Sequence, residues 1–340
     1  MEAMILAAGK GTRLLPLTLG RPKPLFPILN EPLLHLTFDY LNRFSLSSVF
    51  LNTHHLAPRI EEFVQSEKEC RPFQIHTRYE PEILGTGGGI GSTRGFWKES
   101  PFVVFNGDIV TDIDLQKALD FHQSGPGPVT LILHDYFEFN QISVDGSGRI
   151  RDFRQERGKG LAFTGIHILG KEIFDFLPST GSYDIIPVYQ QMIQEGVPVR
   201  AFISRGHYWR DIGTPKSYLK IHEEMLTEQA FFETSTHQNR IEFKSPSIPR
   251  FQRGTPSKAP PFIKGGPGGI LIHPETRIET EVEFSGWACI GKGCLLKKGC
   301  WIHNSVLWED VIVEKGVSVS ESIIGDGVQI IQDAQRGTFI

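Results

Sequence analysis

The amino-acid sequence predicts an α/β protein that carries a second, repetitive β domain at its carboxy-terminal end. Two observations lead to this prediction. From residue 1 to about 220, short apolar runs alternate with segments of helical periodicity, which is typical of a mostly parallel sheet with helices on both faces. From about 270 to 330, aliphatic residues recur every five or six positions, which is typical of a parallel β-helix.

Six apolar runs are predicted to form the strands of a Rossmann-like sheet. They span residues 4–8, 49–52, 73–78, 102–106, 129–134 and 199–203. Leu34, Phe38 and Leu41 recur at i, i+4 and i+7, so they predict the buried face of a helix. Asn30 and Pro32 are suited to begin that helix. In a sheet of this kind, ligands bind beyond the carboxyl ends of the strands.

Eight aliphatic positions of the repeat are predicted to point into the β-helix. They amount to nearly three coils and are Ile290, Leu296, Ile302, Leu307, Val313, Val319, Ile324 and Ile330. Smaller residues stand two positions before each of them. Cys294 and Cys300 are in this smaller set, so we expect core packing from them and not metal binding. Trp301 and Trp308 should face outward, either at an interface or against the first domain.

Length and composition describe an ordinary globular protein of 340 residues. We place a catalytic domain at 1–231, a linker or insertion rich in Pro, Gly and Ser at 232–269, and the β-helix at 270–340. The net charge of −4 gives no reason to expect nucleic acid or a membrane as a partner. No window approaches the roughly 20 apolar residues of a membrane span, so a cytoplasmic location is expected. The four cysteines include no Cys-x-x-Cys pair.

The segment after the first apolar run is suited to bind phosphate. Gly9 and Gly11 bracket a turn that contains Lys10, with Arg13 just beyond it, and Lys23 follows between two prolines. Glycine lets the backbone approach a ligand closely, and exposed backbone N–H groups suit phosphate oxygens. Several cations in one short stretch indicate a ligand with several negative charges. A nucleoside triphosphate is the predicted ligand.

Two better-known phosphate motifs do not fit this turn. The dinucleotide fingerprint needs a third glycine at the position of Leu14. A P-loop needs Ser or Thr after its lysine, whereas Gly11 follows Lys10. An ordinary solvated surface would mix charge signs, yet residues 3–30 contain no acidic residue.

From Leu6 to Leu25 the chain reads Leu-Ala-Ala-Gly-Lys-Gly-Thr-Arg-Leu-Leu-Pro-Leu-Thr, and then Pro-Lys-Pro-Leu. This resembles the amino-terminal signature of the sugar-1-phosphate nucleotidyltransferases, the NDP-sugar pyrophosphorylases. Members of that family often carry a left-handed hexapeptide-repeat β-helix. The resemblance implies that the triphosphate is bound by Leu6, Ala8, Gly9, Gly11, Thr12 and Arg13. It also implies that Arg13 and Lys23 are catalytic, with Lys23 contacting phosphate near the reacting centre.

Two acidic motifs match those to which the family assigns magnesium. One is Asn106-Gly107-Asp108, and the other is the run from Trp209 to Pro215, which contains Asp211. Two carboxylates with phosphate oxygens form a ligand set that suits Mg²⁺. The resemblance places Asn106 and Gly107 with the nucleotide-binding residues. The twelve histidines show no metal-binding spacing and are interpreted as structural.

The segment 80–89, Glu-Pro-Glu-Ile-Leu-Gly-Thr-Gly-Gly-Gly, resembles the base-recognition segment of the family. The resemblance assigns nucleotide binding to Glu80, Gly85 and Thr86. A carboxylate only accepts hydrogen bonds, and guanine offers two adjacent donors where uracil and thymine offer one. Glu80 therefore favours GTP. The structural alternative is a tight glycine turn that leads into a helix.

The sugar side departs from the family pattern. The resemblance places the sugar 1-phosphate against Lys23, Asn140, Glu156, Arg157, Thr164 and Gly165. Where the family commonly has Tyr-Gly, this chain has Phe139-Asn140. Where the family commonly has Glu-Lys-Pro, this chain reads Gln-Glu-Arg-Gly-Lys from 155 to 159. Arg157 or Lys159 would have to replace the missing lysine. The identity of the hexose is left open by these departures.

The implied reaction joins GTP and mannose 1-phosphate to give GDP-mannose and pyrophosphate, with Mg²⁺ as cofactor. One alternative is a uridylyltransferase for N-acetylmuramate, N-acetylglucosamine or glucose 1-phosphate. Another is a catalytically silent regulatory subunit that binds nucleotide-sugar, which the intact Arg13, Lys23, Asp108 and Asp211 argue against. A third is acetyl transfer by the β-helix. Fewer than three coils are short for the groove that would bind acyl-coenzyme A. The repeat is more suited to homo-oligomer formation.

Overall fold

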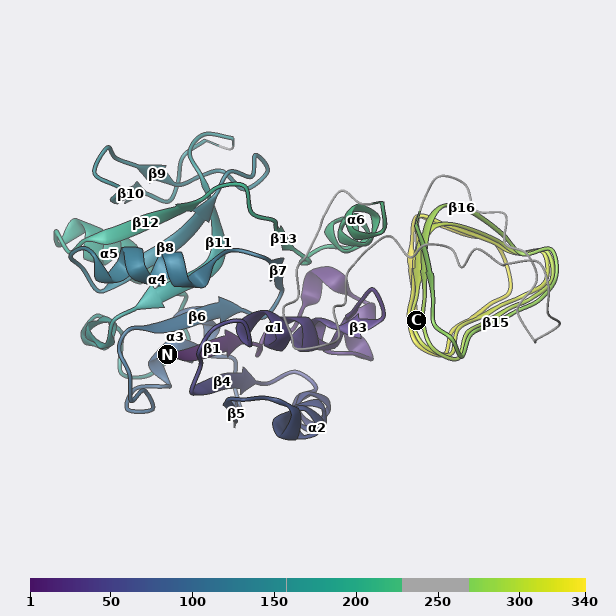
Figure 1. Ribbon diagram of the computed structural model, residues 1–340, viewed down its shortest axis with the longest axis horizontal. Coiled ribbons are helices and arrows are strands. Elements are labelled where there is room, and N and C mark those ends of the chain that lie inside the picture. Colours follow the sequence, from purple (N-terminus) through teal and green to yellow (C-terminus); the bar gives the residue numbers. More distant parts are fainter. Residues whose placement is uncertain (157, 228–268) are drawn as a thin grey trace. The chain divides into compact units, whose positions relative to one another are not determined.

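A computed structural model describes residues 1–156, 158–227 and 269–340 (Figure 1). Apart from residue 269, the predicted linker or insertion lies outside the described residues. The chain forms two compact units, Met1–Lys10 with Leu34–Asp211, and Gly11–Leu33 with Ile212–Ile340. Residues 11–33 and 212–227 thus belong to the same unit as the β-helix, which differs from the domain boundary placed at residue 231. In the described part of the chain, no helix has the length and apolar character needed to cross a bilayer.

The first unit is built on a seven-stranded sheet of order β12-β8-β11-β6-β1-β4-β5. Its strands are β1 (Glu2–Leu6), β4 (Ser48–Thr53), β5 (Gln74–Tyr79), β6 (Phe102–Asn106), β8 (Val129–His134), β11 (Ala162–Leu169) and β12 (Val199–Ser204). The six predicted strands are all present. The sequence patterns do not predict β11, which lies between β6 and β8 and is antiparallel to both. The other neighbours are parallel, so the prediction of a mostly parallel sheet is confirmed.

Helices cover both faces of this sheet (Figure 1). They are α1 (Leu33–Leu41), α2 (Ala57–Glu67), α3 (Gly85–Gly91), α4 (Leu115–Gln123) and α5 (Ile185–Gln194). Alternation along β6 shows the two faces, because Phe102 lies in one core with Tyr189 of α5 while Phe105 contacts Tyr40 of α1 at a ring separation of 5.6 Å. The predicted buried face of α1 is confirmed. Asn30 does not begin α1, since it has a φ of 69° in the turn between β2 (Pro27–Ile28) and β3 (Glu31–Pro32).

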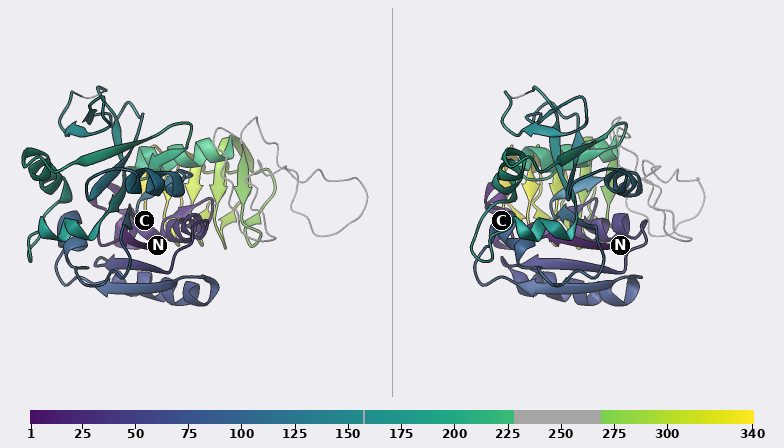
Figure 2. Two further views of the ribbon diagram at one scale, coloured as in Figure 1. Left: turned by 60° about the vertical axis from the view of Figure 1, so that its left-hand side comes forward. Right: turned by 90° about the vertical axis from the view of Figure 1, so that its left-hand side faces the viewer.

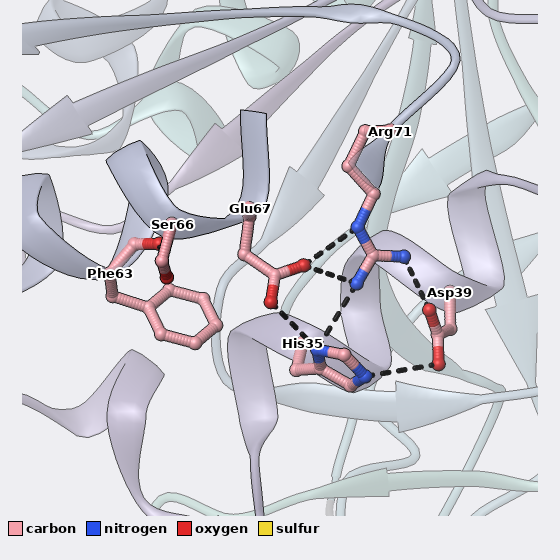
Figure 3. Close-up of polar contacts among 6 residues, drawn as sticks. All are labelled: His35, Asp39, Phe63, Ser66, Glu67 and Arg71. Atoms are coloured by element: carbon pink, nitrogen blue, oxygen red, sulfur yellow. Dashed lines mark hydrogen bonds and ion pairs between the residues drawn. The ribbon is translucent and has the colours of Figure 1, made fainter. Parts of the chain in front are cut away.

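A charged network joins α1 to the end of α2 (Figure 3). Arg71 donates hydrogen bonds to both Asp39 and Glu67, and His35 lies 2.9 Å from Glu67 and 3.5 Å from Asp39. Burial alone would raise the pKa of Glu67, yet the hydrogen bonds from His35 and Arg71 lower it. Because the Arg71 side chain is only 5% exposed, removal of either carboxylate would leave a buried charge without part of its compensation, so the network fixes how the two helices pack.

The second unit contains α6 (Pro215–Leu226) and the β-helix. The coils superimpose as a triangle in Figure 1, and their strands stack side by side in Figure 2. Three parallel stacks form the sides, and they consist of β14 (Ile270–Ile272), β15 (Arg277–Ile278), β16 (Glu283–Ile290), β17 (Leu295–Leu296), β18 (Trp301–Leu307), β19 (Ile312–Val313), β20 (Ser318–Ser320), β21 (Ile323–Ile324), β22 (Gln329–Ile330), β23 (Ala334–Gln335) and β24 (Thr338–Phe339). One stack, β14-β16-β18-β21-β24, has five strands. The repeat is therefore longer at both ends than the nearly three coils predicted.

The interior of the β-helix follows the predicted pattern. All eight aliphatic positions are buried in one core, and Cys294 and Cys300 lie among them as predicted. Burial raises the pKa of each thiol to about 12, so neither is a reactive thiolate. Trp308 is only 2% exposed because Phe26 covers it, with ring centroids 4.7 Å apart. Of the two expectations for Trp308, an exposed interface is wrong, and contact with a preceding part of the chain is confirmed.

Candidate active site

A short antiparallel ribbon brings the two acidic motifs together. It consists of β7 (Ile109–Thr111) and β13 (Trp209–Asp211), and its register pairs Asp211 with Ile109, the residue after Asp108. Both aspartates are half-buried. Two carboxylate positions that are far apart in the sequence thus become near neighbours just beyond the end of β6.

This pair fits a hard divalent cation in the chemistry of its donors, because carboxylate oxygens are what Mg²⁺ prefers. Within the described ranges, no group of three or more His, Cys, Asp or Glu residues could hold a metal ion. Asp108 and Asp211 would therefore hold Mg²⁺ together with phosphate oxygens and water, which is how this ion is commonly bound. Magnesium at this position stays a prediction.

Close backbone contacts shape the strand ends around this ribbon. The Gly107 N–H donates to the Leu6 carbonyl at 3.0 Å, and a Cβ on Gly107 would lie only 2.7 Å from that oxygen. Gly165 has a φ of 79°, and a Cβ there would lie 2.6 Å from Nδ2 of Asn106. The pairing of β6 with β11 thus sets Asn106, a predicted nucleotide contact, beside Gly165, a predicted sugar contact.

Two predicted sugar contacts have their side chains turned into the protein. The Thr164 hydroxyl donates to the Ile132 carbonyl at 2.7 Å, and Thr164 is fully buried. Asn140 accepts from the Tyr136 N–H at 2.8 Å and donates to Asp135 at 2.7 Å. Both side chains are thus engaged within the protein, and contact of these two residues with the sugar 1-phosphate stays a prediction. Thr164 ties strand β11, which contains Gly165, to β8, and Asn140 holds the loop that contains Phe139.

The remaining predicted sugar residues lie at the surface or outside the described residues. Glu156 is mostly exposed and pairs with Lys159 at 2.5 Å. The Gly158 N–H donates to the Asn140 carbonyl at 3.0 Å, which ties this turn to the Asn140 loop. Arg157 lies outside the described residues. Lys159 is therefore an exposed cation that is paired with Glu156. Its exposure is compatible with the predicted role of replacing the missing lysine.

Glu80 is held from two sides. Its side chain accepts hydrogen bonds from the Asn52 amide at 2.8 Å and from the Leu84 N–H at 3.1 Å, and the residue is 2% exposed. Asn52 in turn accepts from the Ala7 N–H at 2.8 Å. The network joins the end of β1 to the end of β4 and to the segment before α3. A guanine would have to share this carboxylate with the donors already present, and contact between Glu80 and the base stays a prediction.

The hydroxyl of Thr86 is engaged within the protein. It accepts from the Ile185 N–H at 3.0 Å and contacts Asp184 at 3.4 Å, so it joins the first turn of α3 to the first turn of α5. Gly85 has a φ of 72°, and a Cβ there would lie 2.6 Å from the Tyr183 carbonyl oxygen. The predicted nucleotide-binding residues Gly85 and Thr86 are thus fixed by the segment around Tyr183.

Sequence reasoning missed Asn52, Trp209 and Arg210. Asn52 follows the apolar run of β4 just as Asn106 follows that of β6, and this shared asparagine was an available signal. The Trp209 indole donates to the Thr164 carbonyl at 2.8 Å. Arg210 is 8% exposed and donates to the Tyr136 hydroxyl at 2.8 Å. These two side chains link the Asp211 motif to the predicted sugar side, and no local pattern distinguishes them from core residues.

Of the predicted phosphate-binding residues, Leu6, Ala8 and Gly9 belong to the first unit, and the others belong to segment 11–33 of the second unit. Gly11 has a φ of 62°, and a Cβ there would lie 2.8 Å from Thr18, so the turn requires glycine. Thr12 and Arg13 are exposed on the short 3₁₀ turn that follows. Lys23 is 9% exposed and opens another such turn between its two prolines.

Segment 11–33 is attached firmly to the β-helix. Arg21 donates to Asp326 at 3.0 Å and to Glu309 at 2.9 Å, and its guanidinium lies 5.4 Å from the centre of the Trp308 ring. The Trp308 indole donates to the Tyr218 hydroxyl of α6 at 3.0 Å. The cations Arg13 and Lys23 are therefore carried by a segment whose support comes from the carboxy-terminal repeat.

Comparisons with known proteins identify the family of the chain. Residues 2–228 match the family described as nucleotidyl transferase, and residues 267–336 match the GMPPB C-terminal domain. A UTP–glucose-1-phosphate uridylyltransferase of Synechocystis is 27% identical over 95% of this chain and 87% of its own length. A mannose-1-phosphate guanylyltransferase of Mycobacterium tuberculosis is 27% identical over 93% of this chain and 82% of its own length. The solved structure of HddC from Yersinia pseudotuberculosis is 25% identical, with a TM-score of 0.57 over 66% of this chain and 98% of that one. The chain belongs to the nucleotidyl transferase family.

Proposed function

We propose that the protein transfers a nucleotidyl group from a nucleoside triphosphate to a sugar 1-phosphate with Mg²⁺ as cofactor. The reaction we favour converts GTP and mannose 1-phosphate to GDP-mannose and pyrophosphate. The observation that carries the proposal is the β7–β13 ribbon. It sets Asp108 and Asp211 together just beyond the end of β6, and β6 is the direct neighbour of the strand that leads into Gly9.

Support for the guanylyl reaction comes from the carboxy-terminal domain and from one relative. The GMPPB C-terminal domain matches the repeat, and the M. tuberculosis relative is named a mannose-1-phosphate guanylyltransferase. The Synechocystis relative, equally identical, is named for UTP and glucose 1-phosphate. A uridylyltransferase is therefore the alternative within the same class.

The chemistry is an in-line displacement at phosphorus. An oxygen of the sugar 1-phosphate bonds to the α-phosphorus of the triphosphate, and the bond from that phosphorus to the bridging oxygen breaks, so pyrophosphate leaves. The attacking oxygen is already anionic, so no Ser, Cys or His nucleophile is required. The obstacle is repulsion between two anions, which Arg13 and Lys23 would offset. Mg²⁺ held by Asp108 and Asp211 would supply further neutralisation of phosphate charge.

The base preference depends on Glu80 in this proposal. Its carboxylate would accept from N1–H and N2–H of guanine, and Asn52 would hold it in the required orientation through the 2.8 Å bond. Replacement of Glu80 by Gln should weaken the use of GTP relative to UTP. If the ratio of the two kcat/KM values is unchanged in that variant, Glu80 does not read the base.

The direct test measures pyrophosphate release from each of the four nucleoside triphosphates against a panel of sugar 1-phosphates in the presence of Mg²⁺. The panel contains mannose, glucose, N-acetylglucosamine and N-acetylmuramate 1-phosphates. We expect the highest kcat/KM with GTP and mannose 1-phosphate. Turnover only with UTP would overturn the guanylyl proposal in favour of the uridylyl alternative.

A regulatory subunit without activity is the alternative of another class. It would release no pyrophosphate with any pair, yet it would bind GDP-mannose, which calorimetry can measure. Assembly into a homo-oligomer through the β-helix and a cytoplasmic location also stay predictions. Light scattering of the full chain tests the assembly.

A further inference from the structure

Helix α3 has an unusual sequence for a helix. It reads Gly-Thr-Gly-Gly-Gly-Ile-Gly, so five of its seven residues are glycine. Each glycine disfavours the helical state relative to alanine, and so short a helix gains little from its own hydrogen bonds. The stability of α3 must therefore come from the residues packed around it.

Tyr183 supplies much of that packing. A Cβ on Gly87 would lie 2.5 Å from the Tyr183 ring, and one on Gly91 would lie 2.6 Å from its hydroxyl. A Cβ on Gly85 would lie 2.6 Å from the Tyr183 carbonyl oxygen, and one on Gly88 would lie 2.6 Å from the neighbouring Gly181 carbonyl oxygen. Four of the glycines thus form a groove that only a helix without side chains on this face can offer.

Backbone hydrogen bonds fix the same contact. The Tyr183 carbonyl accepts from the N–H groups of Gly87 at 2.9 Å and Gly88 at 3.1 Å, which are donors of the first helical turn. The Tyr183 N–H donates to the Leu84 carbonyl at 2.9 Å. The phenol hydroxyl donates to the Pro178 carbonyl at 3.0 Å. The N–H groups of Gly87 and Gly88 are therefore used by the protein itself.

The fifth glycine faces the opposite side of α3. A Cβ on Gly89 would lie 2.9 Å from the Asn52 amide nitrogen and 3.4 Å from a carboxylate oxygen of Glu80. The helix is thus held between Tyr183 on one side and the Asn52–Glu80 pair on the other. Any shift of α3 away from Tyr183 must change the space available to that pair.

We propose that Tyr183 is a positioning residue for the nucleotide, because it holds the glycine helix α3 folded and thereby fixes Leu84, Thr86 and the Asn52–Glu80 pair. This inference rests on the proposed nucleotidyl transfer. It assigns four of the five glycines of α3 to packing against Tyr183 and its neighbour Gly181, whereas the base-recognition motif alone would assign them to the ligand.

The test compares Tyr183→Ala, Tyr183→Phe and Gly87→Ala in the full chain. Tyr183→Ala removes the aromatic ring from the groove, and Tyr183→Phe removes only the hydroxyl. The methyl group added by Gly87→Ala would displace the Tyr183 ring. We expect the KM for the nucleoside triphosphate to rise about tenfold in Tyr183→Ala and Gly87→Ala, with the KM for the sugar 1-phosphate changed by less than about twofold. Tyr183→Phe should stay close to the wild-type values. Gly146→Ala is the matched control, since a Cβ there meets no atom within 4 Å.

Amide hydrogen exchange of residues 84–91 provides a readout that does not depend on turnover. It should become faster in Tyr183→Ala and Gly87→Ala and stay unchanged in Gly146→Ala. The double variant Gly87→Ala/Tyr183→Ala should recover part of the protection, because the methyl group then occupies space that the ring has left.

The outcomes distinguish a failure of the positioning role of Tyr183 from a failure of the proposed nucleotidyl transfer. If the wild-type chain releases pyrophosphate but Tyr183→Ala and Gly87→Ala keep its KM values and its exchange rates, the positioning role is wrong and the proposed function stands. If the wild-type chain neither turns over nor binds any nucleoside triphosphate, the proposed function fails, and the positioning role fails with it. Should Tyr183→Ala not fold, Gly87→Ala and the double variant decide the question.

Discussion

The turn at Gly9 and Gly11 and the helix α3 are both rich in glycine, and both lie in motifs that match nucleotide-binding segments. Their glycines meet different surroundings. A Cβ on Gly9 would contact no atom within 4 Å, whereas every glycine in α3 would bring a Cβ within 3 Å of another part of the protein. Glycine at position 9 leaves room for a ligand, and glycine in α3 leaves room for Tyr183. The same residue type thus leaves open space in one segment, which the proposed triphosphate would occupy, and serves protein packing in the other.

Support for the two segments also differs. Segment 11–33, which carries predicted phosphate contacts, is supported by aromatic and ionic contacts with the β-helix, in which Trp308 contacts Phe26 and Arg21. Helix α3 is supported by Tyr183, which packs in the space left by the missing side chains of its glycines. Four experiments test this comparison, in order of decreasing expected effect.

Removal of the aromatic support should have the largest effect. We expect Trp308→Ala to lower the free energy of unfolding by about 3–5 kcal/mol, because a fully buried indole leaves a cavity beside Phe26. Urea denaturation measures this change. Trp301→Ala is the matched control on the same β-helix, since Trp301 is only partly buried and stacks on His303. Equal losses in the two variants would show that Trp308 is not the anchor.

Gly9→Ala should separate activity from stability. The added methyl group meets no protein atom but occupies the space proposed for the triphosphate, so we expect kcat/KM to fall about 100-fold. The melting temperature should stay unchanged, as scanning calorimetry would show. Full activity in this variant would remove the argument that Gly9 makes room for a ligand.

Low pH should destabilise the packing of segment 11–33 on α6, because His222 of α6 becomes protonated. Its Nε2 accepts from the Leu29 N–H at 3.3 Å, and burial lowers its pKa to about 4. The folded chain keeps His222 neutral while the unfolded chain protonates below pH 6.5, so this stability is complete above pH 6.5 and is lost as the pH falls toward 4. Between pH 7 and pH 5 we expect a loss of about 2 kcal/mol from this group.

The His222→Gln variant isolates this contribution. Glutamine can still accept from Leu29 but does not titrate, so the loss between pH 7 and pH 5 should be smaller than in the wild type by that amount. His122 and His167, whose pKa values burial lowers to about 4 and about 3, remain in both proteins and cancel in the difference. Identical pH dependence in the two proteins would contradict the role of His222.

Among the variants expected to change stability, Gly87→Ala should change the free energy of unfolding least, and the sign of the change is the informative part. Helix propensity alone predicts stabilisation by up to about 1 kcal/mol. Collision with the Tyr183 ring predicts destabilisation by about 1–2 kcal/mol. We expect destabilisation in urea, with Gly146→Ala near zero. A more stable Gly87→Ala protein would show that Tyr183 does not fill the groove.

The sequence predicted those parts of the molecule that are encoded locally. Apolar runs located β1, β4, β5, β6, β8 and β12 to within a residue or two, and the hexapeptide period identified the inward positions of the β-helix. Strand β11 escaped because Thr164 and Gly165 were interpreted for ligand contact, and its antiparallel insertion depends on distant partners. The segment of α3 was interpreted as a base-binding segment or as a tight turn that leads into a helix. That the glycines themselves form the helix could not be predicted, since Tyr183, which packs on them, lies far along the chain.

The same limit applies to the candidate site. The motifs identified Asp108 and Asp211, and only the register of β7 with β13 shows that they lie together. Asn140 and Thr164 were placed against the sugar by motif position, whereas hydrogen bonds to Tyr136 and Ile132 turn their side chains inward. The direction in which a side chain points depends on tertiary contacts that no local pattern contains.

One measurement tests the central claim most directly: pyrophosphate release from GTP and mannose 1-phosphate in the presence of Mg²⁺, by the wild-type chain and by Asp108→Ala and Asp211→Ala. We expect steady turnover by the wild type, none when Mg²⁺ is removed with a chelator, and a loss of at least about 1,000-fold in each variant with an unchanged melting temperature. Turnover by either variant at the wild-type rate would contradict the claim that the ribbon of β7 and β13 assembles the catalytic centre.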